Sequence, residues 1–143
     1  VSESFDTGNK NRLETETTHL NDGMLRILTI ITQMQTSHTC LLLDEIENGI
    51  NPELVERLMD YLVSSNKQVI VTTHSPMVLN YLDEQVAKDG VFLVYRNAAG
   101  YTRCGRYFQS NRTREKLRLL GPGEVFVDTT MQEVSSDLEH ELT

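Results

Sequence analysis

Residues 39–45 read TCLLLDE, and residues 68–75 read QVIVTTHS. Both stretches contain a short apolar run that does not alternate with polar residues, which is typical of strands covered on both faces of a sheet. Both end in reactive side chains, with Asp44 and Glu45 after the first run and His74 after the second. The carboxyl ends of parallel strands share one edge of a sheet, and ligands collect at that edge. The pattern therefore predicts that the two carboxylates and the imidazole meet at one site.

Helical signals precede, separate and follow these two strands. Apolar residues recur at helical spacing over residues 24–34 and again over residues 54–62. A polar cap, in two cases followed by proline, stands before each of three predicted helices: Asn21 with Asp22, Asn51 with Pro52, and Ser75 with Pro76. Alternating strands and helices at this spacing predict βαβ units. We therefore expect an α/β fold with a mostly parallel sheet flanked by helices.

The two ends of the chain have weaker patterns. Residues 1–18 contain little apolar material and are expected to form a linker or flexible segment. The folded lobe is expected to cover residues 19–130. It includes a β-hairpin over residues 91–105, at the edge of the sheet, and a basic helix over residues 112–120 that a Gly-Pro-Gly sequence ends. Residues 131–143 have no clear period and are expected to form an acidic tail.

The composition limits the class of protein. The chain has 143 residues, 38% of them hydrophobic and 24% charged, which fits one globular domain or a piece of a larger one. No apolar run approaches the roughly 18 residues of a spanning helix. The polar N-terminus has no signal peptide and starts at Val1 without a Met, so we expect no membrane partner and a chain cut from a longer sequence. Two cysteines, Cys40 and Cys104, favour a reducing, cytoplasmic compartment.

The charge is unevenly distributed. The formal net charge is -8, which argues against nucleic-acid binding over the whole surface. Residues 96–118, which begin with Arg96 and end with Arg118, nevertheless contain seven basic residues and one acidic residue. This basic segment has two interpretations: either it binds DNA phosphates, or it pairs with the acidic tail.

The acidic pair has a specific chemical use. A carboxylate at a strand end, here Asp44, can hold Mg²⁺ through water, since Mg²⁺ keeps much of its hydration shell. The adjacent Glu45 points to the other side of the strand end and can polarise a water molecule for attack on phosphorus. The imidazole of His74, on a neighbouring strand end, can donate a hydrogen bond to a terminal phosphate oxygen. Together these residues indicate nucleotide hydrolysis.

Four motifs in a fixed order resemble the C-terminal half of an ABC-type, SMC-like ATPase head. Within that class they resemble the AAA15/OLD-like ATPases of bacteria, some of which are linked to phage defence. The motifs are a signature motif at residues 20–26 (LNDGMLR), a Walker B motif at residues 41–45 (LLLDE), a D-loop at residues 48–52 (NGINP) and an H-loop in residues 69–76 (VIVTTHSP). The resemblance covers residues 19–83 well and residues 91–128 more loosely, and it implies a P-loop NTPase fold.

The resemblance also implies roles for single residues. Glu45 would be the general base, Asp44 would hold Mg²⁺, and His74 would sense the γ-phosphate of ATP. The signature motif lies at a helix N-terminus, where free N–H groups and the helix dipole favour phosphate. Four residues would contact ATP bound by the opposite protomer of a head-to-tail homodimer: Asn21, Asp22, Gly23 and Asn51. The implied cofactors are therefore ATP and Mg²⁺.

Two departures from the family pattern matter. Asn21 stands where the signature serine is expected, and its amide can still donate to a phosphate with a different reach. The sequence G-x-x-x-x-G-K-S/T, whose backbone N–H groups cradle phosphates, does not occur in the 143 residues. In the family this P-loop lies on the N-terminal lobe. We therefore expect a partner lobe that carries the P-loop, from the same gene or a separate chain, and no tight ATP binding by this chain alone.

Three functions are compatible with these residues. The first is an ATPase lobe that hydrolyses ATP when it is joined to a P-loop lobe. The second is a non-catalytic half-ATPase module that docks on a partner protein and regulates it. The third is a metal nuclease built on Asp44, Glu45 and Glu47, although three acids on one short loop seldom form a two-metal site. Arg26, one turn into the signature helix, has two interpretations: a contact to the signature loop or partner surface, and a solvated side chain.

Overall fold

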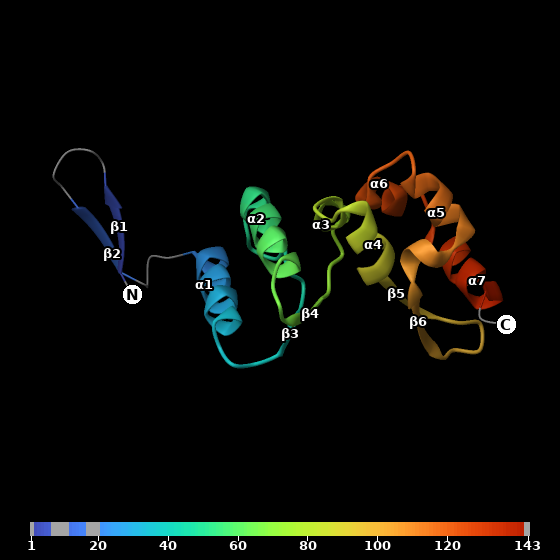
Figure 1. Cartoon of the computed structure of the whole chain (residues 1–143), viewed down its shortest axis with the longest axis horizontal. Coiled ribbons are helices and arrows are strands. Elements are labelled where there is room, and N and C mark those ends of the chain that lie inside the picture. Colours follow the sequence, from blue (N-terminus) through green and yellow to red (C-terminus); the bar gives the residue numbers. More distant parts are fainter. Residues whose placement is uncertain (1, 7–11, 17–20, 142–143) are drawn as a thin grey trace. The chain divides into compact units, whose positions relative to one another are not determined.

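The computed structural model describes residues 2–6, 12–16 and 21–141, and it divides into two compact units, residues 1–73 and residues 74–143. The first unit contains β1 (Ser2–Asp6), β2 (Arg12–Glu16), α1 (Asp22–Met34), β3 (Cys40–Leu43), α2 (Pro52–Val63) and β4 (Gln68–Val71) (Figure 1). The second contains α3 (Pro76–Asn80), α4 (Glu84–Gly90), β5 (Phe92–Arg96), β6 (Thr102–Arg106), the 3₁₀ turn η2 (Tyr107–Gln109), α5 (Asn111–Leu117), α6 (Pro122–Val127) and α7 (Met131–Glu141).

Helices α1 and α2 begin where the sequence predicts. Asn21 is the N-cap of α1, and its Oδ1 accepts a hydrogen bond from the N–H of Met24 at 2.8 Å. Asn51 caps α2 by accepting from the N–H of Glu53 at 3.0 Å, and Pro52 is the first helical residue. Each cap satisfies a backbone donor that the helix itself cannot pair, which stabilises the helix by about 1 kcal/mol. The predicted caps Asn21 and Asn51 are confirmed, whereas Ser75 precedes Pro76 of α3 without a side-chain capping bond.

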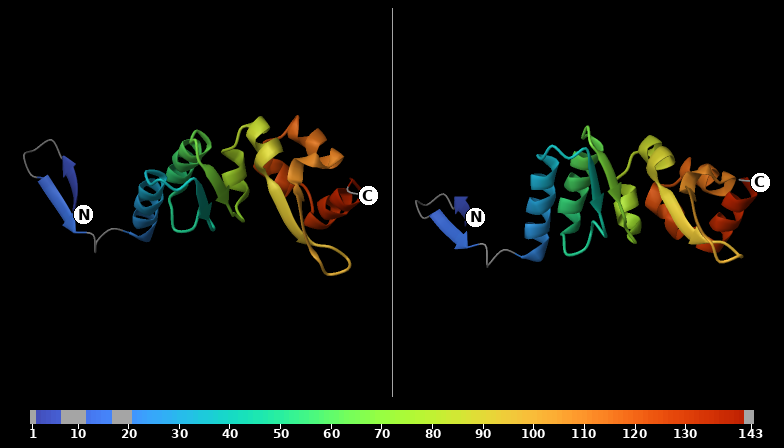
Figure 2. Two further views of the ribbon diagram at one scale, coloured as in Figure 1. Left: turned by 60° about the horizontal axis from the view of Figure 1, so that its bottom comes forward. Right: turned by 90° about the horizontal axis from the view of Figure 1, so that it is seen from below.

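Strands β3 and β4 form the predicted parallel pair, in which Leu42 lies opposite Ile70 and Leu41 opposite Val69. Helices α1 and α2 lie on the same side of this pair (Figure 2). The other face is uncovered, because Leu42 is 75% exposed and Ile70 is 48% exposed. The prediction that both faces are buried was therefore wrong for this chain. A parallel sheet normally has helices on both faces, and the first unit provides them on one.

The core of the first unit holds the segment after β3 in place. Its buried apolar side chains come from α1, β3, this segment and α2: Ile30, Met34, Leu41, Ile46, Ile50, Val55, Leu58, Met59 and Leu62. Ile46 follows the acidic pair directly and is completely buried. The backbone that carries Asp44 and Glu45 is thus anchored on its C-terminal side by hydrophobic packing.

Strands β1 and β2 lie where the sequence analysis expects a linker or flexible segment over residues 1–18; residues 1, 7–11, 17 and 18 lie outside the described residues. Strands β1 and β2 pair in antiparallel register, with Ser2 opposite Glu16 and Phe5 opposite Leu13. Phe5 and Leu13 are the one large apolar residue of each strand. A single apolar residue per strand gives no alternation, and for this reason the sequence pattern did not predict the hairpin.

Strands β5 and β6 form the predicted hairpin, from Phe92 opposite Arg106 to Arg96 opposite Thr102. Among the described residues this hairpin is a two-stranded sheet of its own, without ladder hydrogen bonds to β3 or β4. Its place at the edge of the parallel sheet stays a prediction, because the two strand pairs belong to different units. Within the second unit, one face of the hairpin packs on α7, where Gly105 lies against the side chain of Leu138.

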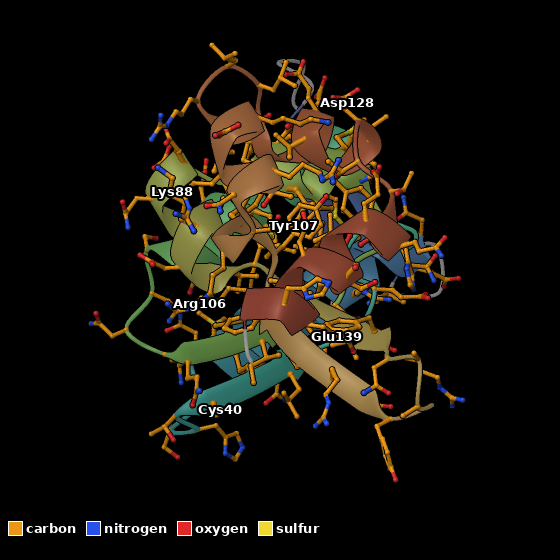
Figure 3. All side chains as sticks on the ribbon, turned by 90° about the vertical axis from the view of Figure 1, so that its right-hand side faces the viewer. Cys40, Lys88, Arg106, Tyr107, Asp128 and Glu139 are labelled. Carbon is orange, nitrogen blue, oxygen red and sulfur yellow. The ribbon has the colours of Figure 1, made fainter. Side chains whose placement is uncertain are left out.

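Tyr107 lies at the centre of the second core (Figure 3). It is 1% exposed, and its ring meets that of Phe108 edge-on with centroids 4.9 Å apart. Its hydroxyl group is hydrogen-bonded to Thr129 Oγ1. Burial raises the pKa of the Tyr107 phenol, an effect that the bond to Thr129 opposes in part. The other members of this core come from η2 and from α4 to α7: Ala87, Phe108, Leu117, Val125, Val134 and Leu138.

Residues 131–141 form helix α7 where the sequence analysis expects an acidic tail over residues 131–143, of which 142 and 143 lie outside the described residues. Val134 and Leu138, four residues apart on α7, are buried in the second core. Arg112 of α5 forms ion pairs with two acids of α7, Glu133 at 3.4 Å and Asp137 at 3.2 Å. The Thr130 hydroxyl, and then Arg112, hold the pKa of the Glu133 carboxyl below its usual range. Part of the basic segment therefore pairs with the acidic C-terminal residues, which was one of its two interpretations.

Two further helices in the second unit were not predicted. Helix α4 follows α3 after a short turn, and α6 begins at Pro122, inside the Gly-Pro-Gly sequence that was expected only to end a helix. Proline fits the first turn of a helix because its missing N–H has no partner there. The preceding basic helix, α5, is correspondingly shorter than predicted and ends at Leu117.

The packing of α7 gives a direct test of its role in the fold. Replacing Leu138 by alanine should lower the free energy of unfolding by about 2–5 kcal/mol, because it leaves a cavity in the second core. The matched control is Leu119→Ala, since Leu119 is 88% exposed and its truncation should change stability by less than about 0.5 kcal/mol. Urea denaturation of both variants measures the difference, and equal stabilities would contradict the packed position of α7.

Candidate functional site

The acidic pair lies at the carboxyl end of β3, and both side chains are exposed. Glu45 has a φ angle of 45°, and it is the one non-glycine residue with a positive φ in the described part of the chain. A residue with a Cβ in this left-handed region is strained, by about 1–3 kcal/mol. Such strain persists only where surrounding contacts hold the backbone, and the contacts around Glu45 do so from two sides.

The first of these contacts come from Thr72, which follows β4. Its hydroxyl oxygen accepts a hydrogen bond from the N–H of Glu45 at 2.9 Å and donates to Oδ1 of Asp44. Its backbone carbonyl accepts from the N–H of Ile46 at 3.2 Å. One threonine therefore orients the carboxylate of Asp44 and fixes the peptide groups on both sides of Glu45. The sequence analysis assigned no role to Thr72, although its position at a strand end was the available signal.

The second set of contacts comes from Arg26 on α1. Its guanidinium donates from Nη2 to the backbone carbonyl of Asp44 and, at 2.9 Å, to the carbonyl of Glu45. The three residues line an open depression between α1 and the end of β3. Arg26 was predicted either to contact the signature loop or partner surface or to be solvated. In the structure it binds the backbone of the acidic pair.

The start of α1 packs directly on the segment before α2. Gly23 is buried, and a Cβ at this position would lie 2.0 Å from the carbonyl oxygen of Gly49 and 3.3 Å from the Cα of Ile50. Gly49 has a φ angle of 73°, a conformation that favours glycine. The two glycines allow the two backbones to touch, and this contact brings the predicted signature motif against the predicted D-loop.

The polar residues of these two motifs lie at helix starts. Asn21 and Asn51 use their amide oxygens for capping, so the capping bonds do not involve their NH₂ groups, which are the groups that could donate to a phosphate. Asp22 is exposed in the first turn of α1. Its negative charge stabilises the helix dipole there, whereas it opposes an anionic ligand at the same position.

The remaining predicted residues are less well connected to the acidic pair. His74 is the first residue of the second unit, so its proximity to Asp44 and Glu45 stays a prediction. Glu47 is half-buried, with one carboxylate oxygen fully enclosed. In the part of the chain that the structure describes, no group of three or more His, Cys, Asp or Glu side chains is arranged to hold a metal ion. The carboxylate cluster that a nuclease needs is therefore not formed there.

The chemical groups at the site are of the types that bind Mg²⁺ and a nucleotide. An exposed carboxylate, that of Asp44, lies beside the hydroxyl group of Thr72, and both are oxygen ligands of the kind that Mg²⁺ prefers. Helix α1 is 13 residues long and starts at the predicted signature motif. Its N-terminal N–H groups suit a phosphate.

Comparison with known proteins defines the class. The chain is similar to a solved structure described as "Structural biochemistry of ATP-driven dimerization and DNA stimulated activation of SMC ATPases", with 17% sequence identity and a TM-score of 0.50. The similarity covers 78% of this chain and 69% of the other. The chain therefore shares the mixed α/β fold of that structure.

The family follows from the sequence model that matches residues 2–80, which is more than half of the chain. The chain belongs to the family described as "AAA domain, putative AbiEii toxin, Type IV TA system". No curated protein matches the chain. Within the described residues, no helix has the length and apolar character that crossing a membrane requires.

The contact between the two glycines can be tested by adding one methyl group. Gly23→Ala should lower the free energy of unfolding by about 1–3 kcal/mol, because the new Cβ meets backbone atoms that cannot rotate away. Gly90→Ala is the matched control, since a Cβ at Gly90 has no other atom within 4 Å, and it should be neutral or slightly stabilising. Urea denaturation compares the two variants. Equal effects would show that α1 does not pack on Gly49.

Proposed function

We propose that this chain is the Walker B lobe of an ABC-type ATPase, which hydrolyses ATP when a P-loop-bearing lobe completes it. The observation that carries the proposal is the fixed acidic pair. Asp44 and Glu45 stand at the end of a parallel strand, Thr72 of the adjacent strand end orients them, and the signature motif packs on the D-loop beside them. Fixed groups at this edge of a parallel sheet are what phosphoryl transfer requires.

Each acid has a separate task in this proposal. Asp44 holds Mg²⁺ through water, while Thr72 donates to one of its carboxylate oxygens and keeps the carboxylate in place. Bound Mg²⁺ neutralises part of the phosphate charge. Glu45 orients and polarises the attacking water molecule as general base. The left-handed backbone at Glu45 sets the direction of its side chain relative to that of Asp44, so the two carboxylates can act on different parts of the substrate.

The remaining motif residues act on the nucleotide. His74 senses the γ-phosphate by donating a hydrogen bond to it. Asn21, Asp22 and Gly23 at the start of α1, together with Asn51 at the start of α2, approach the ATP of the opposite protomer in a head-to-tail homodimer. Their common location at two touching helix starts supports this assignment.

The missing P-loop lobe is part of the proposal. The uncovered face of β3 and β4, with Leu42 and Ile70 exposed, supports a further layer that packs on this face in the complete ATPase, since parallel sheets are covered on both sides. We propose residues 19–130 as the core of this lobe, extended by α7 because Val134 and Leu138 pack into it. The resemblance to AAA15/OLD-like ATPases, a cytoplasmic location and a role in phage defence stay predictions.

The role of Glu45 can be tested in the completed enzyme. Glu45→Gln, assayed after this chain is combined with a P-loop lobe, should lower ATP turnover by about 10²–10⁴-fold, because an amide cannot accept the proton. Nucleotide-driven dimerisation should persist, since the side chain keeps its size. The control is Glu56→Gln, an exposed position on α2. Phosphate release and light scattering measure the two properties, and unchanged turnover in Glu45→Gln would refute the assignment.

The alternative is the non-catalytic module, in which the same lobe docks on a partner and regulates it. The assay just described separates the two functions. If no P-loop lobe, in cis or in trans, produces phosphate release with the wild-type chain, the regulatory module is the better description.

A DNA contact is a second candidate property, and the hairpin β5–β6 is the observation that favours it. Residues 92–106 contain three arginines and no acidic residue. Arg96 and Arg106 are exposed on the hairpin, and the guanidinium of Arg106 lies 6.0 Å from the ring centroid of Phe92, which is itself 54% exposed. By contrast, Arg112 and Lys116 form ion pairs within the second unit. We therefore place the candidate phosphate contacts on the hairpin and not on α5.

This placement predicts which arginines control the salt dependence of DNA binding. The double variant Arg96→Gln/Arg106→Gln should reduce the slope of log K against log salt by about 2, because each lost phosphate contact removes about 0.9. Arg112→Gln is the matched control from the same basic segment and should leave the slope unchanged. Fluorescence anisotropy with a labelled duplex at several salt concentrations measures both. A slope reduced only by Arg112→Gln would place the contact on α5.

A further inference from the structure

Arg26 joins two parts of the first unit that are distant in sequence. It stands near the start of α1, four residues after the first helical residue Asp22, and donates to the consecutive carbonyl groups of Asp44 and Glu45. It is half-buried. Both acceptors are backbone atoms, so the contact acts on the backbone conformation of the acidic pair and does not occupy the two carboxylates. One oxygen of the Asp44 carboxylate accepts from Thr72, and one of the Glu45 carboxylate accepts from the Asn48 amide at 3.3 Å.

Two neighbouring carbonyl groups determine the direction of the side chain between them. The carbonyl of Asp44 belongs to the peptide group before Glu45, and the carbonyl of Glu45 belongs to the peptide group after it. Fixing both peptide planes fixes φ and ψ of Glu45, and hence the direction of its Cα–Cβ bond. The observed φ of 45° is a conformation that glutamate does not adopt without such support.

The support comes from both sides of the turn. Thr72 holds the N–H of Glu45 and the N–H of Ile46, whereas Arg26 donates to the two carbonyl groups. The carbonyl of Glu45 also accepts from the backbone N–H of Asn48 at 2.9 Å, so Arg26 is the contact that comes from α1. Thr72 directly follows β4, so the strand pairing fixes its position. Arg26 belongs to the helix whose first residues form the signature motif.

We propose that Arg26 is a positioning residue that sets the direction of the Glu45 carboxylate and makes it depend on the position of α1. This inference rests on the proposed function, because it gives Arg26 a task in the hydrolysis step assigned to Glu45. When α1 packs against the end of β3, the guanidinium of Arg26 keeps Glu45 in the left-handed conformation. When α1 moves away from the end of β3, the bonds to the two carbonyl groups break and Glu45 relaxes to an ordinary backbone conformation.

Three variants test the inference in the ATPase completed with a P-loop lobe. Arg26→Met keeps most of the aliphatic chain and removes all donors, so it should lower kcat by about tenfold or more. The KM for ATP should stay within about twofold, because Arg26 does not touch the nucleotide in this proposal. Arg26→Lys should recover only part of kcat, since an ammonium group lacks the planar fork of the guanidinium. Arg57→Met, an exposed arginine on α2, is the matched control and should behave as wild type.

A second measurement needs no catalysis. Amide hydrogen exchange of this chain should be faster at Glu45 and Ile46 in Arg26→Met than in wild type, because the turn loses both bonds from Arg26 and keeps only those from Thr72 and Asn48. Equal exchange rates, or an equal kcat in an active enzyme, would overturn the inference while leaving the proposed function intact. An inactive wild-type complex would instead refute the proposed function, and the exchange rates would still decide whether Arg26 holds the turn.

Discussion

The hydroxyl group of Thr72 is the interaction on which the candidate site depends. It lies where two parallel strands end, accepts a hydrogen bond from the backbone of Glu45 and donates one to the carboxylate of Asp44. A single oxygen atom thus connects the strand pairing to the geometry of both acids. Without it, the register between β3 and β4 would bring the strand ends together but would not orient the carboxylates. The sheet determines where the acids lie, and Thr72 orients the carboxylate of Asp44 and holds the backbone N–H of Glu45.

Local signals predicted the parts of the fold that local chemistry determines. Asn21 and Asn51 were recognisable as caps because a short polar side chain before an apolar stripe satisfies a helix start in any context. Helix α7 was missed because its only buried apolar residues in the sequence pattern, Val134 and Leu138, are surrounded by acids. Its stability comes from Tyr107 and the rest of the second core and from Arg112, which are distant in sequence. Tertiary packing, and not propensity, makes this segment helical.

The candidate site also combines features that the local sequence predicts with features that only tertiary contacts determine. Asp44 and Glu45 could be chosen as candidates from the sequence, since two acids directly after an apolar strand are a moderately specific pattern that the ordered motifs around them strengthen, and their catalytic roles stay predictions. The contacts of Arg26 could not, because they are made to backbone carbonyl groups, and every residue in the chain offers a carbonyl group. The uncovered face of β3 and β4 could not be foreseen either. An apolar strand predicts a layer of other residues over each of its faces, but Leu42 and Ile70 remain exposed in this chain.

The approach of Gly23 to Gly49 has a mechanical consequence. Most contacts between a helix and a loop are made by side chains, which can change rotamer and absorb a small shift. Here two main chains touch with no side chain between them, so no rotamer change can absorb a shift at this contact. Tilting the first turn of α1 must either displace the segment before α2 by a similar amount or open a gap. As long as the two main chains stay in contact, a displacement of the start of α1 is therefore transmitted to the start of α2.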